Sequence, residues 1–373
     1  MNPARILVVD DEPGILRAVD RILGTEHTII GTRSSRDALS LAASVLPDLA
    51  IVDIRMPDLD GFELMARLKA RFHDLDVILM TGSVDDLDEK LVRAIRSPAF
   101  FFIQKPFDRE VLRTLVDRCL ELRWRRQEHR QHLERLETEM SEARAFQRSL
   151  LPPSEARIND VAISCRYAPS ANLGGDLVDY VAAGTDRTAL LIADVSGHGV
   201  SAAMLTAIVK SAFHASHVDG FEPSAVVDRV AAGLAAFSLE RFVTLIAALV
   251  PSGGGELRYV NAGHPPFLLW GSARTPLWLE STGPIISPAF LGSRWDVGRA
   301  PITPGDQLLL YTDGVSEILA ERDGDAVVAF SKTIAAAPSC ADLVDAILDD
   351  VRAALDDAPQ PDDLTLLAAQ LIR

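Results

Sequence analysis

Acidic residues that directly follow apolar runs are the side chains of this sequence best suited to chemistry. Asp10 and Asp11 follow the run ILVV, and Asp53 follows LAIV. Thr81 follows a fourth run, VILM, and Lys105 comes after a fifth, FFFIQ. Carboxylates that meet at one place repel one another, and hard oxygen ligands of this kind suit Mg²⁺. The three carboxylates therefore predict a magnesium site, with Thr81 and Lys105 beside it.

The runs that precede these residues are typical of buried strands. These four runs and a further one at residues 27–31 alternate with stretches of helical periodicity over about residues 1–108. The alternation predicts a doubly wound α/β domain, in which helices cover both faces of a five-stranded parallel sheet. Working residues gather at the carboxyl ends of such strands. Any one of the five residues could simply be a polar residue at the end of a strand, with no function. That interpretation accounts poorly for all five together.

Four motifs of this domain, VVDDE, IVDIRMPDLDG, MTGS and QKPF, strengthen the prediction by their order and spacing. With them, residues 1–122 resemble the receiver domain of two-component response regulators. The resemblance implies that Asp53 accepts a phosphoryl group from a cognate histidine kinase. It also implies that Asp10, Asp11, Asp53 and the backbone carbonyl of Arg55 hold Mg²⁺.

Three further residues receive roles from the same resemblance. Thr81 would hydrogen-bond the phosphoryl group, Lys105 would pair with its charge, and Phe102 occupies the aromatic switch position. Phosphorylation adds negative charge at a site that can draw Thr81 and Lys105 inward. The added charge would thereby bias a two-state face of the domain.

A second group of acidic residues stands at the ends of apolar runs in the half of the chain after Pro153, and most of them lie near glycines. These are Asp176, Asp194, Asp313 and the pair Asp362 and Asp363. A single Asp of this kind is commonly a turn residue, but four such corners favour a shared site. Separated carboxylates with almost no His or Cys suit Mg²⁺ or Mn²⁺. Two such ions can activate a water for attack on phosphorus.

Strands separated by Gly and Pro turns carry these acids. The strand candidates are residues 162–169, 188–195, 242–250, 256–263, 265–270, 306–313 and 363–370. Two helical blocks are expected near residues 200–217 and 222–239. This arrangement predicts an α+β domain in which two antiparallel sheets pack together between helices, an α-β-β-α sandwich.

The motifs LLPP, GGD, DVSGHGVSAAM, NAGHPP, YTDGVSE and DDLTLL resemble the SpoIIE/RsbU-type protein serine phosphatases, within the type 2C metal-dependent superfamily. The resemblance implies two Mn²⁺ or Mg²⁺ ions in residues 151–373. One ion would take Asp176, a bridging Asp194 and the carbonyl of Val195. Asp313 would hold the other ion together with Asp362, for which Asp363 is the less favoured alternative.

Other residues near these motifs have more than one possible role. His264 in NAGHPP is either a general acid or, as is commoner before two prolines, structural, and Asn261 shares its motif. His198 and Asp179 are candidates to orient metal ligands. Two departures from the family pattern, at Leu177 and around Ile286, affect pocket walls and a substrate-facing loop, and leave the predicted ligands in place.

Residues 108–150 contain no Pro or Gly and predict one long helix. Leucines and other apolar residues recur every seven positions, and the pattern is broken at Arg126, His129 and Gln147. Either a single helix packed on its own domains or a parallel coiled coil fits this pattern. We favour the coiled coil, which predicts a homodimer whose linker carries rotation or unwinding between the domains.

Composition excludes several other classes of protein. The net charge of −16 disfavours nucleic acid and anionic membranes as partners, and no apolar run is long enough to span a bilayer. We therefore expect a cytoplasmic response regulator that controls a serine/threonine phosphatase. The resemblance implies a phosphorylated anti-sigma-factor antagonist as substrate. The alternative is a phosphorylation-controlled adaptor with a catalytically silent phosphatase-like domain, and a DNA-binding regulator fits less well.

Overall fold

A computed structural model describes residues 3–372 except 83–99, 198, 237–240, 272–273, 291, 324–329, 331–332, 335–336, 338 and 357. The chain divides into two compact units, Met1–Leu136 and Glu137–Arg373. Within the described residues, no helix combines the length and the apolar character needed to cross a membrane. Each unit is described by itself below.

The first unit contains a five-stranded parallel sheet of order β2-β1-β3-β4-β5. Its strands are β1 (Arg5–Val9), β2 (Thr28–Thr32), β3 (Leu49–Asp53), β4 (Asp76–Thr81) and β5 (Phe100–Gln104). Among its described residues, the helices are α1 (Pro13–Leu23), α2 (Ser35–Val45), α3 (Gly61–Arg71) and the start of α5 (Arg109–Leu150). The order reverses between β1 and β3, and ligands bind at such a point in doubly wound sheets.

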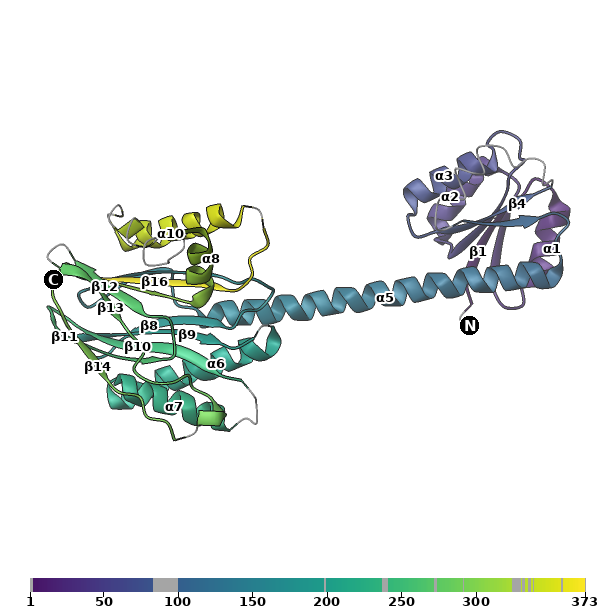
Figure 1. Cartoon of the computed structure of the whole chain (residues 1–373). Helices are drawn as coiled ribbons and strands as arrows, with labels where there is room; N and C mark the ends of the chain where they lie inside the picture. The colour runs from purple at the N-terminus through teal and green to yellow at the C-terminus, as the bar shows by residue number, and fades with distance from the viewer. Residues whose placement is uncertain are drawn as a thin grey trace. The chain divides into compact units, whose positions relative to one another are not determined.

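Alternate residues of β1 face the two cores of this unit. Ile6 and Val8 pack with α1 and α5, whereas Leu7 and Val9 pack with α2 and α3. All four side chains are fully buried. The parallel sheet predicted from the continuous apolar runs is therefore confirmed, with helices on both of its faces (Figure 1).

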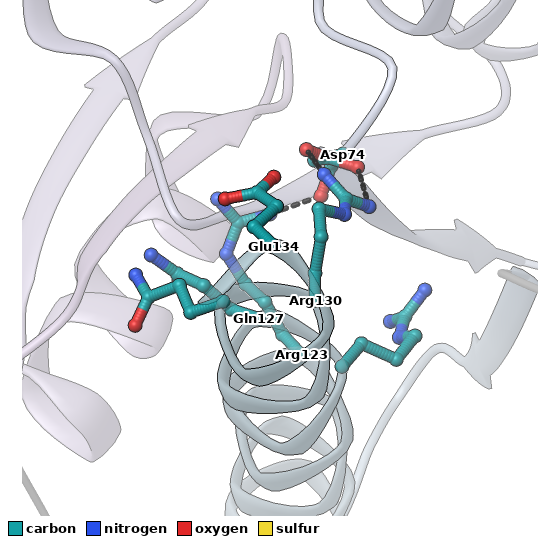
Figure 2. A pocket seen from close by; sticks show the side chains of 7 residues that line it. Asp74, Arg123, Gln127, Arg130 and Glu134 are labelled. Atoms are coloured by element: carbon teal, nitrogen blue, oxygen red, sulfur yellow. Dashed lines mark hydrogen bonds and ion pairs between the residues drawn. The ribbon is translucent and has the colours of Figure 1, made fainter. Parts of the chain in front are cut away.

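Helix α5 has an apolar beginning and a polar middle. Leu112, Val116 and Cys119 are buried in the core of the first unit, so this part of the seven-residue pattern packs inside the domain. Beyond it, Arg130 Nη1 and Nη2 donate to the two carboxylate oxygens of Asp74 at 2.6 and 2.8 Å (Figure 2). Residues 125–139 are exposed in the structure.

The second unit contains two antiparallel sheets. One has the order β14-β11-β10-β9-β8 and the other β13-β12-β15-β16-β7-β6. The first consists of β8 (Asp176–Ala182), β9 (Arg187–Val195), β10 (Val243–Pro251), β11 (Gly255–Ala262) and β14 (Gly298–Ile302). The second consists of β6 (Glu155–Ile158), β7 (Val161–Ala168), β12 (Phe267–Gly271), β13 (Arg274–Leu279), β15 (Gln307–Tyr311) and β16 (Leu364–Leu371).

Helices flank the two packed sheets. The α6 (Val200–Ala215) and α7 (Pro223–Ala235) helices, joined by the short 3₁₀ helix η1 (Ser216–Asp219), cover the first sheet. The α8 (Asp313–Asp323) and α10 (Cys340–Leu355) helices cover the second (Figure 1). A further 3₁₀ turn, η2, spans Pro288–Phe290. The predicted α-β-β-α sandwich is confirmed.

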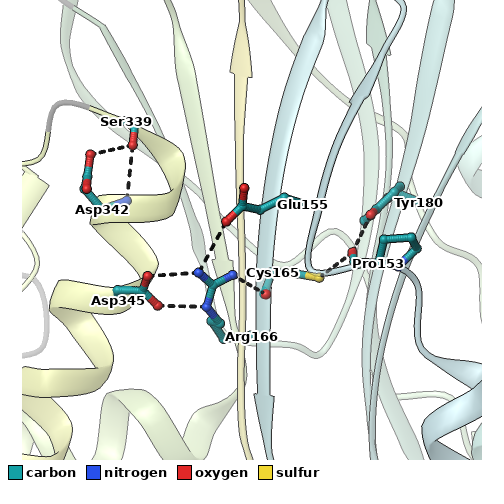
Figure 3. Close-up of polar contacts among 8 residues, drawn as sticks. All are labelled: Pro153, Glu155, Cys165, Arg166, Tyr180, Ser339, Asp342 and Asp345. Carbon is teal, nitrogen blue, oxygen red and sulfur yellow. Dashed lines mark hydrogen bonds and ion pairs between the residues drawn. The ribbon is translucent and has the colours of Figure 1, made fainter.

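Polar contacts tie the second sheet to α10 and fix the segment that follows α5. Arg166 on β7 donates to both carboxylate oxygens of Asp345 on α10, at 2.7 and 2.9 Å (Figure 3). The carbonyl oxygen of Pro153 accepts hydrogen bonds from the Tyr180 hydroxyl and, at 3.5 Å, from the Cys165 thiol. The segment directly after α5 is therefore fastened to β7 and β8.

One strand end and one strand differ from what the sequence predicts. The strand expected over residues 306–313 ends at Tyr311, and Asp313 is the first residue of α8. Asp176 opens β8, a strand that the sequence pattern does not reveal because the run LVDYVA carries an acid in its middle. Both acids therefore lie at junctions of elements.

Candidate metal and phosphoryl sites

The acidic site of the first unit brings together three of the predicted side chains. Asp10, Asp11 and Asp53 each offer a carboxylate oxygen, and these three oxygens lie within 4.8 Å of one another. Asp10 and Asp53 are buried, and Asp11 is half-buried. The parallel register of β1 and β3 sets Asp53 beside the segment that follows Val9.

Lys105 balances two of these charges. Its Nζ lies 2.7 Å from Asp10 Oδ2 and 3.0 Å from Asp53 Oδ1. Burial alone would lower the pKa of Lys105, but its two carboxylate partners outweigh burial and raise it. Burial raises the pKa of Asp53, although Lys105 opposes the shift. One cation thus leaves the three carboxylates incompletely compensated.

The other predicted residues of this unit lie at or near the carboxyl ends of β3, β4 and β5. Thr81 is the last residue of β4, and its carbonyl accepts from Lys105 N at 2.7 Å. Phe102 lies on β5 and packs partly buried against the core formed with α2 and α3. Arg55 is exposed two residues after Asp53.

In the second unit, antiparallel pairing places Asp176 and Asp194 opposite each other. Asp176 opens β8 and Asp194 is the penultimate residue of β9, and the two are register partners. Burial, and then the charge of Asp194, raises the pKa of Asp176 well above its usual range. The pair is therefore unfavourable as two carboxylates without a counter-ion.

Two threonine hydroxyls hold Asp176, and the sequence analysis did not identify them. Thr312 Oγ1 and Thr365 Oγ1 donate to Asp176 Oδ2 at 2.8 and 2.6 Å. Both threonines are completely buried. Thr312 directly precedes Asp313 in YTDG, and Thr365 follows Asp362 by three residues in DDLT. These positions are the hint that the sequence offers. The hydroxyls fix one carboxylate oxygen and leave Oδ1 for another partner.

Asp313 and Asp362 complete the acidic cluster. Burial raises the pKa of Asp194 to about 7, and the charges of three other carboxylates add to the shift. These carboxylates belong to Asp313, Asp362 and Asp363. Burial, and then Asp362, raises the pKa of Asp313. The cluster is looser than that of the first unit, since in the described part of the chain no three of its residues bring one carboxylate oxygen each within 4.8 Å of one another.

Asp363 differs from its neighbour Asp362 in its hydrogen bonds. Asp363 Oδ1 accepts from Ser170 N and Oγ at 2.8 and 3.1 Å, and its Oδ2 accepts from Gly175 N at 2.7 Å. Asp362 is exposed and its Oδ1 accepts from Asp363 N at 2.8 Å. The protein thus occupies both oxygens of Asp363, which favours Asp362 as the ligand.

A glycine lets the GGD segment lie close to the backbone of Val195. A Cβ atom on Gly175 would lie 2.4 Å from the carbonyl oxygen of Val195, the predicted backbone ligand. Only glycine lets the two chains approach this closely. Gly175 therefore serves the close packing of the GGD segment against the end of β9.

His264 is a structural residue. It is buried, its Nε2 lies 3.1 Å from the Tyr311 carbonyl oxygen, and its Nδ1 lies 2.7 Å from Thr244 Oγ1. Burial lowers its pKa to about 3. Asn261 Oδ1 accepts from the backbone N of His264 at 2.8 Å. A neutral imidazole with both nitrogens engaged by protein atoms is a poor general acid.

The remaining candidates fall elsewhere. Asp179 Oδ2 accepts from Lys210 Nζ at 2.6 Å and lies 2.8 Å from His214 Nε2, so it fastens β8 to α6. His198 lies outside the described residues. Glu317 on α8 was not anticipated: burial, and then Asp313 and Asp362, raises its pKa.

Both clusters have the donor set of a divalent-cation site. Apart from its ion pair with Lys105, the buried Asp10 Oδ2 has no hydrogen-bond partner within the described residues. In the second unit, the raised pKa values of Asp176, Asp194 and Asp313 all arise from burial among like charges. Cations with a preference for oxygen ligands would relieve this repulsion. The residues present therefore fit Mg²⁺ in the first unit and Mg²⁺ or Mn²⁺ in the second.

Comparison with known proteins identifies both units. The profile of the family described as Stage II sporulation protein E (SpoIIE) matches residues 184–372, and that of the response regulator receiver domain matches residues 6–117. Phosphoserine phosphatase RsbP of Bacillus subtilis is 31% identical over 185 residues, 48% of this chain and 45% of RsbP. Regulatory protein AtoC of Escherichia coli is 37% identical over 131 residues, 34% of this chain and 27% of AtoC. This chain thus spans less than half of either relative.

Solved structures agree with the fold of the second unit. The RsbU and RsbW domains of Rv1364c from Mycobacterium tuberculosis match with 27% identity and a TM-score of 0.50, over 59% of this chain and 62% of that chain. The SiaA-PP2C domain of Pseudomonas aeruginosa matches with 19% identity and a TM-score of 0.52, over 64% and 98%. The second similarity concerns the fold alone.

The raised pKa of Asp194 predicts how pH affects the metal-free protein. A carboxyl with a pKa of about 7 when folded and about 3.9 when unfolded holds its proton more tightly in the folded state. Its contribution to stability is therefore complete at low pH and is lost as pH rises from about 4 to about 7. In EDTA, we expect Asp194→Asn to lose less free energy of unfolding over this range than the wild type, as measured by urea denaturation. Asp228→Asn, at an exposed position on α7, serves as the control, and identical pH profiles for all three proteins would contradict the prediction.

Proposed function

Because this chain belongs to the SpoIIE family and carries a response-regulator receiver domain, we propose that it is a metal-dependent serine/threonine protein phosphatase controlled by phosphorylation of Asp53. The observation that carries the proposal is the carboxylate cluster of Asp176, Asp194, Asp313 and Asp362 at one end of the two packed sheets. An adaptor with a silent phosphatase-like domain would not need to keep these mutually repelling acids.

The residues of the cluster have separable roles in this proposal. When bound, two Mg²⁺ or Mn²⁺ ions would activate a water and neutralise charge on the phosphoryl group. Asp176 and Asp194, with the carbonyl of Val195, would hold one ion. Asp313 and Asp362 would hold the other. The Thr312 and Thr365 hydroxyls orient Asp176, as outer partners of ligands commonly do.

The receiver domain supplies the input. Asp53 lies beside Asp10, Asp11 and Lys105, so an incoming phosphoryl group would meet both the Mg²⁺ ligands and a fixed cation. The expected donor is a histidine kinase. Phosphorylation increases the negative charge at Asp53 and so attracts Lys105 and Thr81. This attraction would stabilise one of two conformations of the domain over the other.

The substrate that we expect is a phosphorylated protein antagonist of an anti-sigma factor. Resemblance to the RsbU-type phosphatases implies this class, and the similarity to a phosphoserine phosphatase, RsbP, supports phosphoserine as the group that is hydrolysed. We also expect this reaction to take place in the cytoplasm.

We also propose a homodimer formed through the middle of α5. Leu133 and Leu136 are 45% and 44% exposed on this helix, and they continue the seven-residue pattern beyond the part buried in the receiver domain. Exposed apolar residues at this spacing are stabilised when a second helix covers them.

Metal-dependent hydrolysis tests the enzymatic proposal. We expect the full chain to hydrolyse a phosphoserine peptide in Mn²⁺, and Asp313→Ala to lose at least about 100-fold in kcat/KM, because loss of even an outer partner of a metal ligand costs about 10–100-fold. Glu321→Ala, exposed on the same helix, should retain activity. Equal, negligible turnover by wild type and Asp313→Ala would leave the adaptor as the better description.

Control by the receiver is tested separately. With acetyl phosphate and Mg²⁺, we expect phosphatase activity of the wild type to rise, whereas Asp53→Ala should not respond because it has no acceptor carboxylate. Asp20→Ala, an exposed position on α1, should respond like the wild type. An equal response of Asp53→Ala and the wild type would refute control through this residue.

Light scattering after gel filtration tests the dimer. The double substitution Leu133→Glu and Leu136→Glu places charge on the apolar seam, so we expect the mass of the particle to halve at micromolar concentration. Gln127→Glu with Gln131→Glu adds the same charge at exposed positions outside the seam and should leave the dimer intact. A monomeric wild type, with and without acetyl phosphate, would rule out the proposed dimer.

A further inference from the structure

Arg241 is anchored on the loop that follows Val195, the predicted backbone ligand. Its Nη1 donates to the Ser196 carbonyl oxygen, and its Nη2 donates to Ser201 Oγ at 2.8 Å. Ser196 comes directly after the last residue of β9, and Ser201 is the second residue of α6. The guanidinium therefore bridges the end of β9 and the first turn of α6, next to the acidic cluster.

Strand pairing holds the backbone of Arg241 in that place. The antiparallel register sets Val243 opposite Val195. The pairing continues beyond the strand ends, where Ser196 N donates to the Phe242 carbonyl oxygen at 3.0 Å and Phe242 N donates to Ser196 Oγ at 3.0 Å. Arg241 is the next residue outward, so its position is tied to the strand that carries Asp194.

A glycine makes room for the guanidinium. A Cβ atom on Gly197 would lie 2.3 Å from Arg241 Nη1 and 3.3 Å from Arg241 Cζ. Gly197 also has a φ of +87°, which favours glycine over residues with a side chain. The loop after Asp194 therefore leaves a seat for the guanidinium directly against its own backbone.

The positive charge of Arg241 is not neutralised by the protein. Both partners of its guanidinium are neutral oxygens, and in the described part of the chain it makes no ion pair. By contrast, Arg229 and Arg258 in the same layer pair with Asp219 and Glu222. Arg241 is half-buried, and a guanidinium has five N–H donors, so donors are left for a partner from outside.

The guanidinium lies on the rim of the acidic cluster and not at its centre. Asp194 is only two residues from Ser196, and burial among like charges raises its pKa to about 7. A cation that reached the centre of the cluster would pair with these uncompensated acids, and Arg241 pairs with none of them. It is therefore placed to meet residues that flank a phosphoserine, while the phosphoryl group itself enters the cluster.

Two exposed apolar side chains adjoin Arg241 on α6. Val200 and Met204 are 49% and 66% exposed. They lie four residues apart and so share one face of the helix, beside the Ser201 that Arg241 holds. Methionine and arginine are enriched where proteins meet partners. We call Arg241, Val200 and Met204 the substrate-reading surface.

We propose that Arg241 is a specificity-determining residue that binds an acidic side chain close to the phosphoserine of the substrate protein, while Val200 and Met204 contact apolar neighbours. A carboxylate suits the planar fork of a guanidinium better than any neutral group does. This inference rests on the proposed function and adds to it the chemical character of the sequence around the phosphoserine.

The test uses phosphoserine peptides that differ in one residue, with Glu, Gln or Lys placed in turn at each position around the phosphoserine. In Mn²⁺, we expect the wild type to show about fivefold higher kcat/KM for Glu than for Lys at one or more positions, as for an exposed ion pair. Arg241→Gln should remove this preference, Arg241→Glu should reverse it, and Arg241→Lys should keep much of it. A merely structural role of Arg241 would lower the hydrolysis of all peptides equally.

Matched controls separate substrate reading from catalysis. Arg352→Gln, at an exposed position on α10 beside the other sheet, should keep the wild-type preference. The ratio of kcat/KM for the best Glu peptide to kcat/KM for p-nitrophenyl phosphate should fall about fivefold in Arg241→Gln, because p-nitrophenyl phosphate has no side chain to bind. Met204→Gln should disfavour peptides with Leu near the phosphoserine, whereas Leu277→Gln, at an exposed apolar position on β13, should not.

The same peptides give the outcomes that would overturn the proposal. A wild type without preference for Glu over Lys at any position would do so, and so would an equal loss of peptide and p-nitrophenyl phosphate hydrolysis in Arg241→Gln. If the variants do not fold, the wild type still decides, since a Glu preference that does not weaken at high salt is not an exposed ion pair. If the wild type binds Mn²⁺ and hydrolyses neither substrate, the proposed phosphatase function fails, and fluorescence anisotropy of the labelled peptides then tests Arg241 by binding alone.

Discussion

Repulsion between buried carboxylates is the constraint on which both units of this protein depend. Two negative charges 4 Å apart repel by about 4 kcal/mol at the effective dielectric of a protein surface. The fold must hold such groups together before any cation is bound. In the first unit Lys105 supplies a permanent positive charge between Asp10 and Asp53. In the second unit no lysine or arginine makes a described ion pair with the acidic cluster, and threonine hydroxyls and backbone N–H groups take that place.

This difference suits the different tasks proposed for the two sites. A receiver site must accept a phosphoryl group and then keep it, so a fixed cation beside Asp53 stabilises the product of the transfer. A hydrolytic site must bind a phosphorylated protein and release the product. The hydroxyls carry only partial charges, so most of the negative charge of the carboxylates is left for the metal ions to neutralise. The pKa of Asp194, raised to about 7, measures how incomplete the compensation is in their absence.

The sequence alone identifies a site residue when the residues next to it mark its position, as at the end of an apolar run. Asp10, Asp53 and Lys105 could be predicted because each follows an apolar run, and the same rule identified Asp194. The roles of Thr312 and Thr365 depend on a register between β15 and β16 that brings together residues more than fifty positions apart. The sequence cannot supply that register. Strand β8 was missed because Asp179, which interrupts its apolar pattern, is buried against Lys210 and His214.

The connector shows how one helix can serve three environments with one continuous backbone. Its first turns complete the core of the receiver domain, its middle is exposed, and its last turns contact the GGD segment, where the Gln147 amide hydrogen-bonds the backbone of Gly174. A strictly periodic coiled coil would place an apolar residue at position 147, which could not pair with the backbone of Gly174. An apolar residue there would leave a buried N–H and a buried carbonyl without partners, at a cost of about 1–3 kcal/mol for each group. The break in the pattern at position 147 therefore has a structural cause within the chain.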